Sequence, residues 1–316
     1  MVTPSHADST TADLLLVNPA AGGGRALKVL PGLRKFADQR GWSVEICLTK
    51  STDDLASQAR GAAEAGRRRI LVLGGDGTFQ LLLNALERHP ETILGVIPAG
   101  GGNDLAAALG LPEDPIQAAA LILDGETCHL DVVRVRTSEG NERLYAGGGG
   151  VGLDAEAARY ASGAYRNLRG RTRYILAVIR ALFGFHSMRA RISIKANEPQ
   201  SLEATALVVC ILNTPTYGAG LWLAPEARID DGALNLVIVE NLSIAKILAL
   251  LPALMTRGEL TTDRVRRFSV ASLRIETDTP RWFHGDGELL GTTPVEISVV
   301  PQAVRVMRAK RKPAFK

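Results

Sequence analysis

The sequence predicts two domains, an α/β domain built on a parallel sheet and then a mainly antiparallel β-sandwich domain. Three observations lead to this fold class. Between Asp13 and Ile97, short apolar runs alternate with helix-like stretches, as in β-α-β units. After about residue 127, the segments become longer and richer in strand-forming residues. A chain of 316 residues is also long enough to divide its core between two domains.

The apolar runs of the first half predict strands at 14–17, 44–48, 70–73 and 93–97. Helices are expected between them at 26–40, 52–65 and 78–88, with a short closing helix at 115–124. Pro31 lacks a backbone donor, so we expect it to kink or restart the first helix. This alternation predicts an α/β domain, in which helices cover both faces of a parallel sheet.

The second half contains seven expected strands and three expected helices. The strands are 129–136, 143–147, 189–195, 203–212, 233–240, 268–276 and 295–299, and the helices are 153–162, 171–184 and 243–256. We therefore divide the chain into a flexible tail (1–12), an α/β domain (13–126), a β-sandwich domain (127–300) and a C-terminal strand with a basic tail (301–316). That last segment can return to the first domain.

Charge and composition narrow the class of protein. The net charge is +4 and the sequence pI is near 9.1, which suits an anionic partner such as a nucleotide, a phospholipid or a nucleic acid. The three cysteines are widely spaced, so neither a disulfide framework nor a zinc site is indicated, and a reducing compartment fits. We expect no transmembrane helix and see no secretory signal.

A glycine-rich loop follows the first expected strand. Residues 18–24 read Asn-Pro-Ala-Ala-Gly-Gly-Gly and lead into a helix, so backbone N–H groups there can face a phosphate. The loop is not a Walker A motif, because the chain contains no Gly-Lys pair, and Leu27 replaces the third glycine of a Rossmann fingerprint. An ordinary tight turn is the alternative.

Two further glycine-rich loops follow the third and fourth expected strands. Residues 74–78 read Gly-Gly-Asp-Gly-Thr, and residues 98–104 read Pro-Ala-Gly-Gly-Gly-Asn-Asp. Asp76 could hold magnesium, orient a hydroxyl or accept its proton, or it could simply cap a helix. Asn103 and Asp104 could also be caps. The carboxyl ends of parallel strands are where open α/β sheets bind ligands, so three such loops favour a phosphate site.

These three loops, in this order, resemble those of the diacylglycerol kinase catalytic-domain superfamily. The resemblance spans nearly all of residues 13–308. It continues through residues 150–155, 218–220, Pro225, Ala227, 230–232 and 286–288. It implies an N-terminal nucleotide-binding α/β domain, a C-terminal β-sandwich that takes the lipid substrate, and transfer of the γ-phosphoryl group of ATP to a lipid hydroxyl.

The resemblance also implies which residues contact the nucleotide. They are Asn18, Pro19, Ala20, Ala21, Gly22, Thr49, Gly74, Gly75, Asp76, Gly77, Thr78, Phe79, Gln80, Gly101, Asn103 and Asp104. At two positions the chain lacks a side-chain group that is usual in the family: Gly101 stands where a Thr is usual, and Leu81 stands where a Glu is usual. A hydroxyl and a carboxylate are therefore missing from the expected nucleotide site. Gln80, in place of an Asn, keeps an amide.

Two carboxylate clusters of the second half have implied roles. The family places a magnesium ion on the Asp231 carboxylate and the backbone carbonyls of Arg228 and Ala233, although Asp-Asp-Gly is also a common turn. The resemblance also places a general base in the segment Asp286-Gly-Glu288. From the sequence alone, this segment is typical of a hairpin turn. Asp76 is a third candidate base. Nearby His284 is interpreted as a polar turn residue.

The leading interpretation is an ATP- and Mg²⁺-dependent lipid kinase, cytoplasmic and peripheral to the inner face of an anionic membrane. Its acceptor is a diacylglycerol-like or related lipid, no nucleic acid is expected as a partner, and a homodimer is left open. Two basic segments could dock on the membrane: the helix with Arg166, Arg169, Arg171, Arg173 and Arg180, and the tail with Arg305, Arg308, Lys310, Arg311, Lys312 and Lys316. The alternatives are an NAD kinase-like enzyme and a non-catalytic nucleotide- or lipid-binding regulator.

Overall fold

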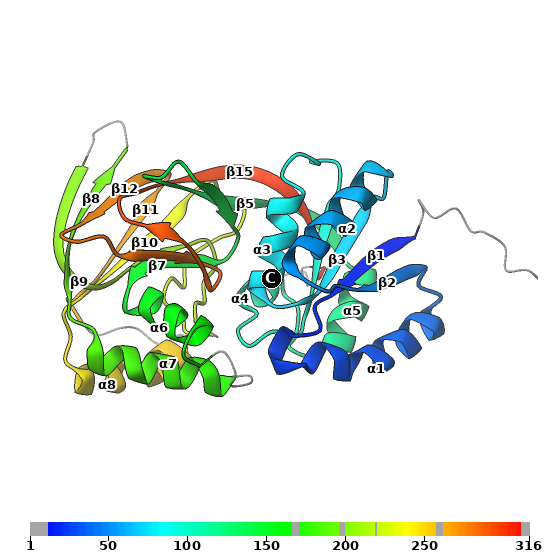
Figure 1. Cartoon of the computed structure of the whole chain (residues 1–316), viewed down its shortest axis with the longest axis horizontal. Coiled ribbons are helices and arrows are strands. Elements are labelled where there is room, and N and C mark those ends of the chain that lie inside the picture. Colours follow the sequence, from blue (N-terminus) through cyan, green and yellow to red (C-terminus); the bar gives the residue numbers. More distant parts are fainter. Residues whose placement is uncertain (1–11, 166–170, 196–199, 219, 257–261, 311–316) are drawn as a thin grey trace, which may run out of the picture. The chain divides into compact units, whose positions relative to one another are not determined.

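A computed structural model describes residues 12–165, 171–195, 200–218, 220–256 and 262–310 (Figure 1). Some residues named in the sequence analysis lie outside these ranges. They are residues 1–11 of the expected tail, and Arg166, Arg169, Arg311, Lys312 and Lys316. The side chains of Arg171 and Arg173 also lie outside the described part of the chain.

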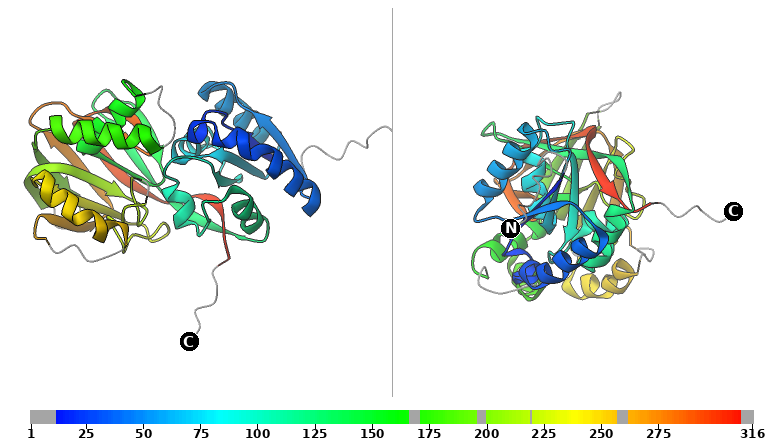
Figure 2. Two further views of the ribbon diagram at one scale, coloured as in Figure 1. Left: turned by 90° about the horizontal axis from the view of Figure 1, so that it is seen from below. Right: turned by 90° about the vertical axis from the view of Figure 1, so that its right-hand side faces the viewer.

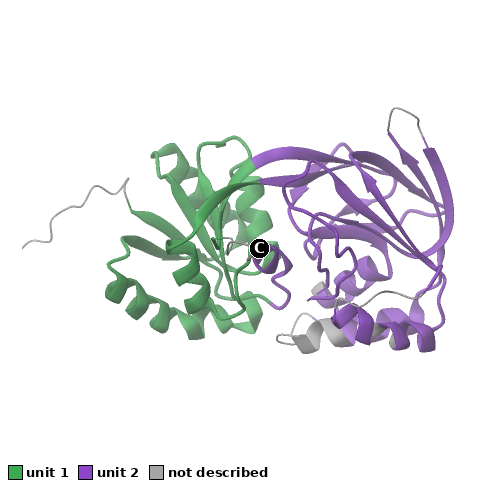
Figure 3. Cartoon of the chain, turned by 180° about the vertical axis from the view of Figure 1, so that it is seen from behind, with its two compact units in different colours: residues 1–100, 109–129, 304–316 green, residues 101–108, 130–303 purple. Residues whose placement is uncertain are grey.

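The chain forms two compact units (Figure 3). Unit 1 contains residues 1–100, 109–129 and 304–316, and unit 2 contains residues 101–108 and 130–303. The sequence places 101–108 in the first domain, whereas these residues cluster with the second. The end of the chain, from residue 304, clusters with unit 1.

Unit 1 is an α/β domain with a parallel sheet in the order β2-β1-β3-β4-β15. Its elements are β1 (Asp13–Val17), a 3-10 turn (Ala21–Gly23), α1 (Arg25–Arg40), β2 (Val44–Leu48), α2 (Thr52–Glu64), β3 (Arg69–Gly74), α3 (Asp76–Ala85), β4 (Ile93–Pro98) and α5 (Pro115–Leu123). The four predicted strands of this unit are confirmed. Helix α1 is not broken at Pro31, where the sequence predicts a kink or restart. It runs through this residue as one helix.

Two pairs of helices cover this sheet. Helix α1 packs with α5, and α2 packs with α3 (Figures 1 and 2). The strand order requires α1 to cross in the opposite direction from α2 and α3, so right-handed crossovers place them on opposite faces. Strands β1 and β3 are consequently buried almost throughout, which explains their unbroken apolar sequences.

Unit 2 is an antiparallel, sandwich-like domain. Its strands are β5 (Glu126–Thr137), β6 (Glu142–Tyr145), β7 (Gly148–Gly152), β8 (Met188–Ile194), β9 (Gln200–Leu212), β10 (Leu234–Glu240), β11 (Val265–Val270), β12 (Ser272–Thr277), β13 (Trp282–Gly285), β14 (Glu288–Thr292) and β15 (Val295–Arg308). Its helices are α4 (Asp104–Ala108), α6 (Leu153–Ser162), α7 (Arg171–Gly184) and α8 (Ile244–Met255). β5 and β15 begin or end in unit 1.

The strands of unit 2 pair as β14-β13-β7-β9-β8-β12-β15, and β10 pairs with both β9 and β11. Their inward side chains form one core that includes Tyr145, Phe283, Val209 and Ile275. The rings of Tyr145 and Phe283 lie 6.3 Å apart in a tilted arrangement. This core fixes β13, and therefore the turn that follows it.

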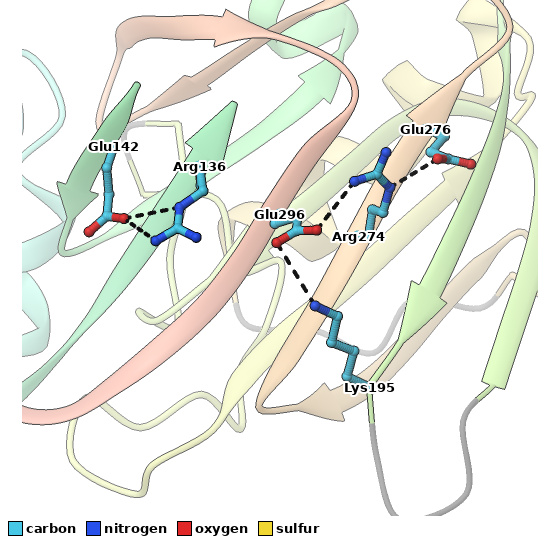
Figure 4. A network of polar contacts seen from close by, with 6 residues as sticks. All are labelled: Arg136, Glu142, Lys195, Arg274, Glu276 and Glu296. Atoms are coloured by element: carbon cyan, nitrogen blue, oxygen red, sulfur yellow. Dashed lines mark hydrogen bonds and ion pairs between the residues drawn. The ribbon is translucent and has the colours of Figure 1, made fainter. Parts of the chain in front are cut away.

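The sheet also has a face crossed by ion pairs. Arg274 on β12 contacts Glu276 and, across the strand pair, Glu296 on β15, while Lys195 reaches the same Glu296 (Figure 4). These side chains are between 37% and 63% exposed, so each pair contributes little to the free energy of unfolding.

β7 is a strand that the sequence does not predict, because four of its five residues are glycine. A Cβ at Gly148 would lie 2.7 Å from the Tyr217 ring, one at Gly149 would lie 2.3 Å from the His284 carbonyl oxygen, and one at Gly150 would lie 2.5 Å from an Asp154 carboxylate oxygen. Neighbouring groups therefore approach the bare backbone of β7 closely.

Candidate active site

The first glycine-rich loop is tied to the second by the side chain of Asn18. Its Nδ2 donates to Oγ1 of Thr78 at 3.0 Å, and its Oδ1 accepts the N–H of Ala20 at 3.0 Å. The backbone N–H of Asn18 also donates to the carbonyl of Leu73. One amide thus fixes both the loop after β1 and the first turn of α3.

Helices α1 and α3 begin in these two loops without a side-chain cap. Their N-cap residues are Gly24 and Gly75, which have no side chain to accept from the first N–H groups. By contrast, Ser51 caps α2, and Asp114 caps α5. Because β1 and β3 are neighbours in the sheet, two helix N-termini without an N-cap side chain follow adjacent strands, which is a favourable place for phosphate groups.

Packing accounts for two of the glycines in the loops. A Cβ on Gly22 would lie 2.1 Å from the carbonyl oxygen of Ala99, and φ at Gly22 is +59°. A Cβ on Gly74 would lie 2.5 Å from the Thr78 side chain. These glycines let the loops after β1, β3 and β4 approach one another, so they shape the site whether or not a ligand touches them.

Thr49, Phe79 and Gln80 are expected nucleotide contacts whose side chains are buried. Thr49 donates from Oγ1 to the carbonyl of Val17 at 3.1 Å, as a strand-terminal threonine would. Phe79 is fully buried, and Gln80 is 4% exposed with its Nε2 lacking a partner among the described residues. Asp76, in contrast, is half-buried in the first turn of α3. Because Phe79 is fully buried, it supports the site by packing in the core.

Asn103 and Asp104 belong to unit 2 in the structure. Asn103 is buried and adopts a left-handed conformation, with φ of +63°. Asp104 is also buried, and its Oδ1 accepts the N–H of Gly220 at 3.0 Å. Their neighbour Gly101 is half-buried. Asp104 consequently holds Gly220, which belongs to a motif of the resemblance that the sequence could not link to it.

The expected magnesium set lies on the turn before β10. Oδ1 of Asp231 accepts the N–H of Ala233 at 3.1 Å, and the residue is exposed. The proposed ligands are all oxygen atoms, which Mg²⁺ prefers, and one carboxylate with carbonyls and waters suits it. These residues fit the ion. In the described part of the chain, no three His, Cys, Asp or Glu side chains cluster as a further metal site.

Asp131 supports this turn and was missed by the sequence analysis. It is fully buried, and its carboxylate accepts the N–H of Gly232 at 2.6 Å and that of Gln302 at 2.7 Å. The only available signal was an acidic residue inside an otherwise apolar strand.

The Asp286 carboxylate is held by three backbone donors. Its Oδ2 accepts from Ala146 at 2.9 Å, and its Oδ1 accepts from Gly147 at 3.0 Å and Gly148 at 3.1 Å. The residue has a φ of +50° in the turn between β13 and β14, which confirms the predicted hairpin. Glu288 is exposed at the start of β14. Three N–H donors stabilise the ionised form of Asp286.

A buried polar network lies beside this turn. The Tyr217 hydroxyl donates to Asp154 Oδ2 at 2.7 Å and lies 2.6 Å from Nε2 of His284. Nε2 is also 3.3 Å from Asp154 Oδ2. Because the hydroxyl has one hydrogen and gives it to Asp154, we assign a proton to Nε2 of His284. His284 is thus 5% exposed and part of a network, rather than the polar turn residue expected.

Burial and hydrogen bonding oppose each other at Asp154. Burial raises the pKa of its carboxyl, but the hydrogen bond and charge of His284, with the Tyr217 hydroxyl and the Ala155 N–H, lower that pKa below its ordinary value. Burial first, and then the Asp154 charge, raise the pKa of Tyr217 well above its ordinary value. Asp154 is therefore ionised and Tyr217 is protonated near neutral pH.

The expected site residues thus fall into two sets. Residues 18–22, 49 and 74–80 lie in unit 1, whereas 101–104, 228–233 and 286–288 lie in unit 2. None of the helices in the described ranges is long and apolar enough to cross a membrane.

Comparison with known families identifies both halves. Residues 13–135 match the diacylglycerol kinase catalytic domain, and residues 148–308 match the YegS C-terminal NAD kinase beta sandwich-like domain. This chain belongs to the diacylglycerol kinase catalytic-domain superfamily. The resemblance and the fold class predicted from sequence are therefore confirmed.

Named relatives agree with this kinase family. The chain is 29% identical over 296 residues to a diacylglycerol kinase of Mycobacterium tuberculosis, covering 93% of this chain and 94% of the relative. It is 26% identical to a diacylglycerol kinase of Staphylococcus epidermidis, covering 94% and 92%. The crystal structure of a diacylglycerol kinase from Bacillus anthracis str. Sterne has the same fold, with a TM-score of 0.71, 22% identity and coverage of 96% and 98%.

Proposed function

We propose that this protein transfers the γ-phosphoryl group of ATP to the hydroxyl of a diacylglycerol-like lipid. Membership of the superfamily supports a kinase, and relatives over the whole chain are named diacylglycerol kinase. The observation that carries the proposal is the pair of helix N-termini with glycine N-caps at Gly24 and Gly75, joined by the Asn18–Thr78 bond. Such donors suit the phosphates of a nucleotide.

Within unit 1, the backbone of the 18–24 and 74–78 loops would hold the phosphates, with Asp76 beside them. A lipid alcohol gives up its proton only as its oxygen bonds to phosphorus, so an acceptor carboxylate must be positioned near it. Asp286 already accepts three N–H bonds, which favours a positioning role for it. Glu288 and Asp76 therefore remain as candidate proton acceptors. Mg²⁺, held by Asp231 and the carbonyls of Arg228 and Ala233, would supply positive charge.

We also propose that the protein works peripherally at the inner face of an anionic membrane, where such a lipid resides. Its net charge of +4 and the basic residues at its C-terminus support this location. A competing acceptor is NAD, because the C-terminal domain matches a family described as NAD kinase beta sandwich-like.

The decisive experiment incubates the protein with γ-labelled ATP and three acceptors separately: a total lipid extract, diacylglycerol in mixed micelles, and NAD. We expect label in lipid, loss of all transfer in excess chelator, and loss of transfer in Asp76→Asn with unchanged thermal unfolding. The matched control, Asp53→Asn, changes an exposed carboxylate of α2 and should keep full activity. Label in NAD alone, or transfer that persists in chelator, would overturn the proposal.

A further inference from the structure

A small cavity lies within unit 2 and is lined by none of the site residues assigned above. Its volume is about 250 Å³, and it is lined by residues of α6, α7 and the segments that follow α7 and precede β13. Helices α6 and α7 pack together beside it (Figure 1). The residues that matter for its chemistry are Glu156, Tyr160, Phe185, His186 and Arg281.

Arg281 brings an unpaired positive charge to this cavity. No described acidic side chain forms an ion pair with it, and its Nε is buried without a hydrogen-bond partner among the described residues. The guanidinium lies 5.6 Å from the centre of the Phe185 ring. The backbone N–H of Arg281 donates to Thr293 Oγ1 at 3.0 Å, which fixes the start of β13. A buried donor of a charged group is costly unless something accepts from it.

Two more guanidinium groups lie over the ring of Tyr160, which lines the cavity. Arg159 and Arg180 lie 4.7 and 4.9 Å from the centre of that ring. The acidic residue in the lining is Glu156, and its Oε2 is already paired with Arg159 at 2.9 Å. The carboxylate of the lining therefore has a partner, and the charge of Arg281 is left without a described acidic one.

We propose that this cavity is a binding site for a phosphate group, with Arg281 as its main ligand. The planar fork of a guanidinium matches two phosphate oxygens at once, and no described acidic side chain is paired with that of Arg281. At ~30 Å³ per water molecule, the volume holds about eight waters. That space accommodates a phosphate with a short polar group.

The phosphate group can come from two sources, free phosphate or the headgroup of a lipid phosphate. A lipid phosphate is also the product class of the proposed reaction. The site itself does not depend on that reaction, since its binding is measured without ATP or an acceptor. Arg281 directly precedes the strand that leads to Asp286 and Glu288, so an occupied site would brace that strand.

The test is isothermal titration calorimetry of the full chain with inorganic phosphate and, separately, with dihexanoyl phosphatidic acid below its micellar concentration. Arg281→Gln should weaken binding by about tenfold or more. Arg159→Gln should also weaken it, because the Glu156 carboxylate then loses its ion-pair partner and repels the anion. The matched control is Arg191→Gln, an exposed arginine on β8 that pairs with Glu203.

Loss of affinity for both ligands in the two test variants, with Arg191→Gln unchanged, supports a general phosphate site. Loss for phosphatidic acid alone supports the same site with a lipid headgroup as its occupant. Equal affinity of the native protein and both test variants for both ligands overturns the proposal. Because Arg159 is exposed on α6, its variant remains informative if Arg281→Gln disturbs folding.

Discussion

Asn18 and Thr78 are hydrogen bonded at 3.0 Å although 60 residues separate them in the chain. The bond makes the loop after β1 and the first turn of α3 a single structural element. Each loop alone has backbone donors for a phosphate, but only their fixed separation can match neighbouring phosphate groups of one nucleotide.

Thr78→Val should therefore weaken ATP binding without unfolding the protein. Valine has nearly the shape of threonine but cannot accept the Asn18 N–H, so the two loops lose their link. A net hydrogen bond contributes about 1 kcal/mol, so we expect the KM for ATP to rise roughly fivefold. Steady-state kinetics with lipid in excess measure this. Thr78→Ser keeps the hydroxyl and should behave as the native protein, and an equal rise in both variants would contradict the idea.

A variant at Asp286 should mainly change stability, whereas a variant at Glu288 should mainly change activity. Asp286→Asn replaces one accepting oxygen by an NH₂ group that faces a backbone donor, so the free energy of unfolding should fall by about 1–3 kcal/mol. Glu288→Gln changes an exposed side chain, so its stability should be unchanged while kcat falls at least tenfold if Glu288 accepts the proton.

Denaturant unfolding and kcat, measured on the same two preparations, test this pair. Full activity in Glu288→Gln would leave Asp76 as the remaining candidate acceptor. Unchanged stability in Asp286→Asn would show that its three N–H bonds do not hold the turn.

The Asp154–Tyr217–His284 network predicts a pH dependence of stability. The pKa of Asp154 is lower in the folded chain than its ordinary value of 3.8, so the network stabilises the fold above that value. This contribution is lost as the pH falls through the lowered pKa. Tyr217→Phe removes the hydroxyl that helps to lower it. We expect a loss of about 1.5–3 kcal/mol at pH 7 that shrinks as the pH falls below about 4.

Denaturant unfolding of the native protein and Tyr217→Phe from pH 7 to pH 3 checks the sign. A difference that stays constant over this range would mean that the hydroxyl contributes packing alone, without an effect on Asp154.

The C-terminal basic residues should contribute to membrane binding, but fewer of them are available than the sequence suggests. Arg305 contacts Glu91, and Arg308 pairs with Glu126 at 2.6 Å, so both are engaged within unit 1. Changing Lys310, Arg311 and Lys312 to Ser should reduce binding to anionic vesicles, because each basic residue near such a surface contributes on the order of 1 kcal/mol.

Vesicle sedimentation at low and high salt measures this, and the KM for ATP should not change. A matched triple variant removes three exposed basic residues from α1, namely Lys28, Arg34 and Lys35. If the two triple variants lose binding equally, net charge explains the effect and the tail has no specific role.

The α/β unit could be predicted from sequence because burial on both faces produces continuous apolar runs. Strands β1 and β3 are such runs, and the chain needs Gly22 after β1 and Gly74 at the end of β3 for close loop packing. β7 could not be predicted in this way. Its glycines have low strand propensity, and they are required by the Tyr217 ring and the His284 backbone, which come from distant segments.

The site was predictable only where its chemistry is local. The glycine-rich loops and the Asp286-Gly-Glu288 hairpin can be recognised from a few consecutive residues. Asp131, Tyr217 and His284 do not, because their partners lie 63 to 171 residues away and are brought near by strand pairing. Their burial, rather than any local pattern, makes them important.

Strand β15 has a consequence for how the protein is made. Its first residues pair with β12, and Arg305 and Val306 pair in parallel with Ile93 and Leu94 of β4. During synthesis, the edge of β4 therefore has no strand partner until residues 305 and 306 have also left the ribosome. An open edge strand is a template for pairing between chains. Nascent or C-terminally shortened forms should accordingly depend on chaperones, even though their first hundred residues contain most of a complete sheet.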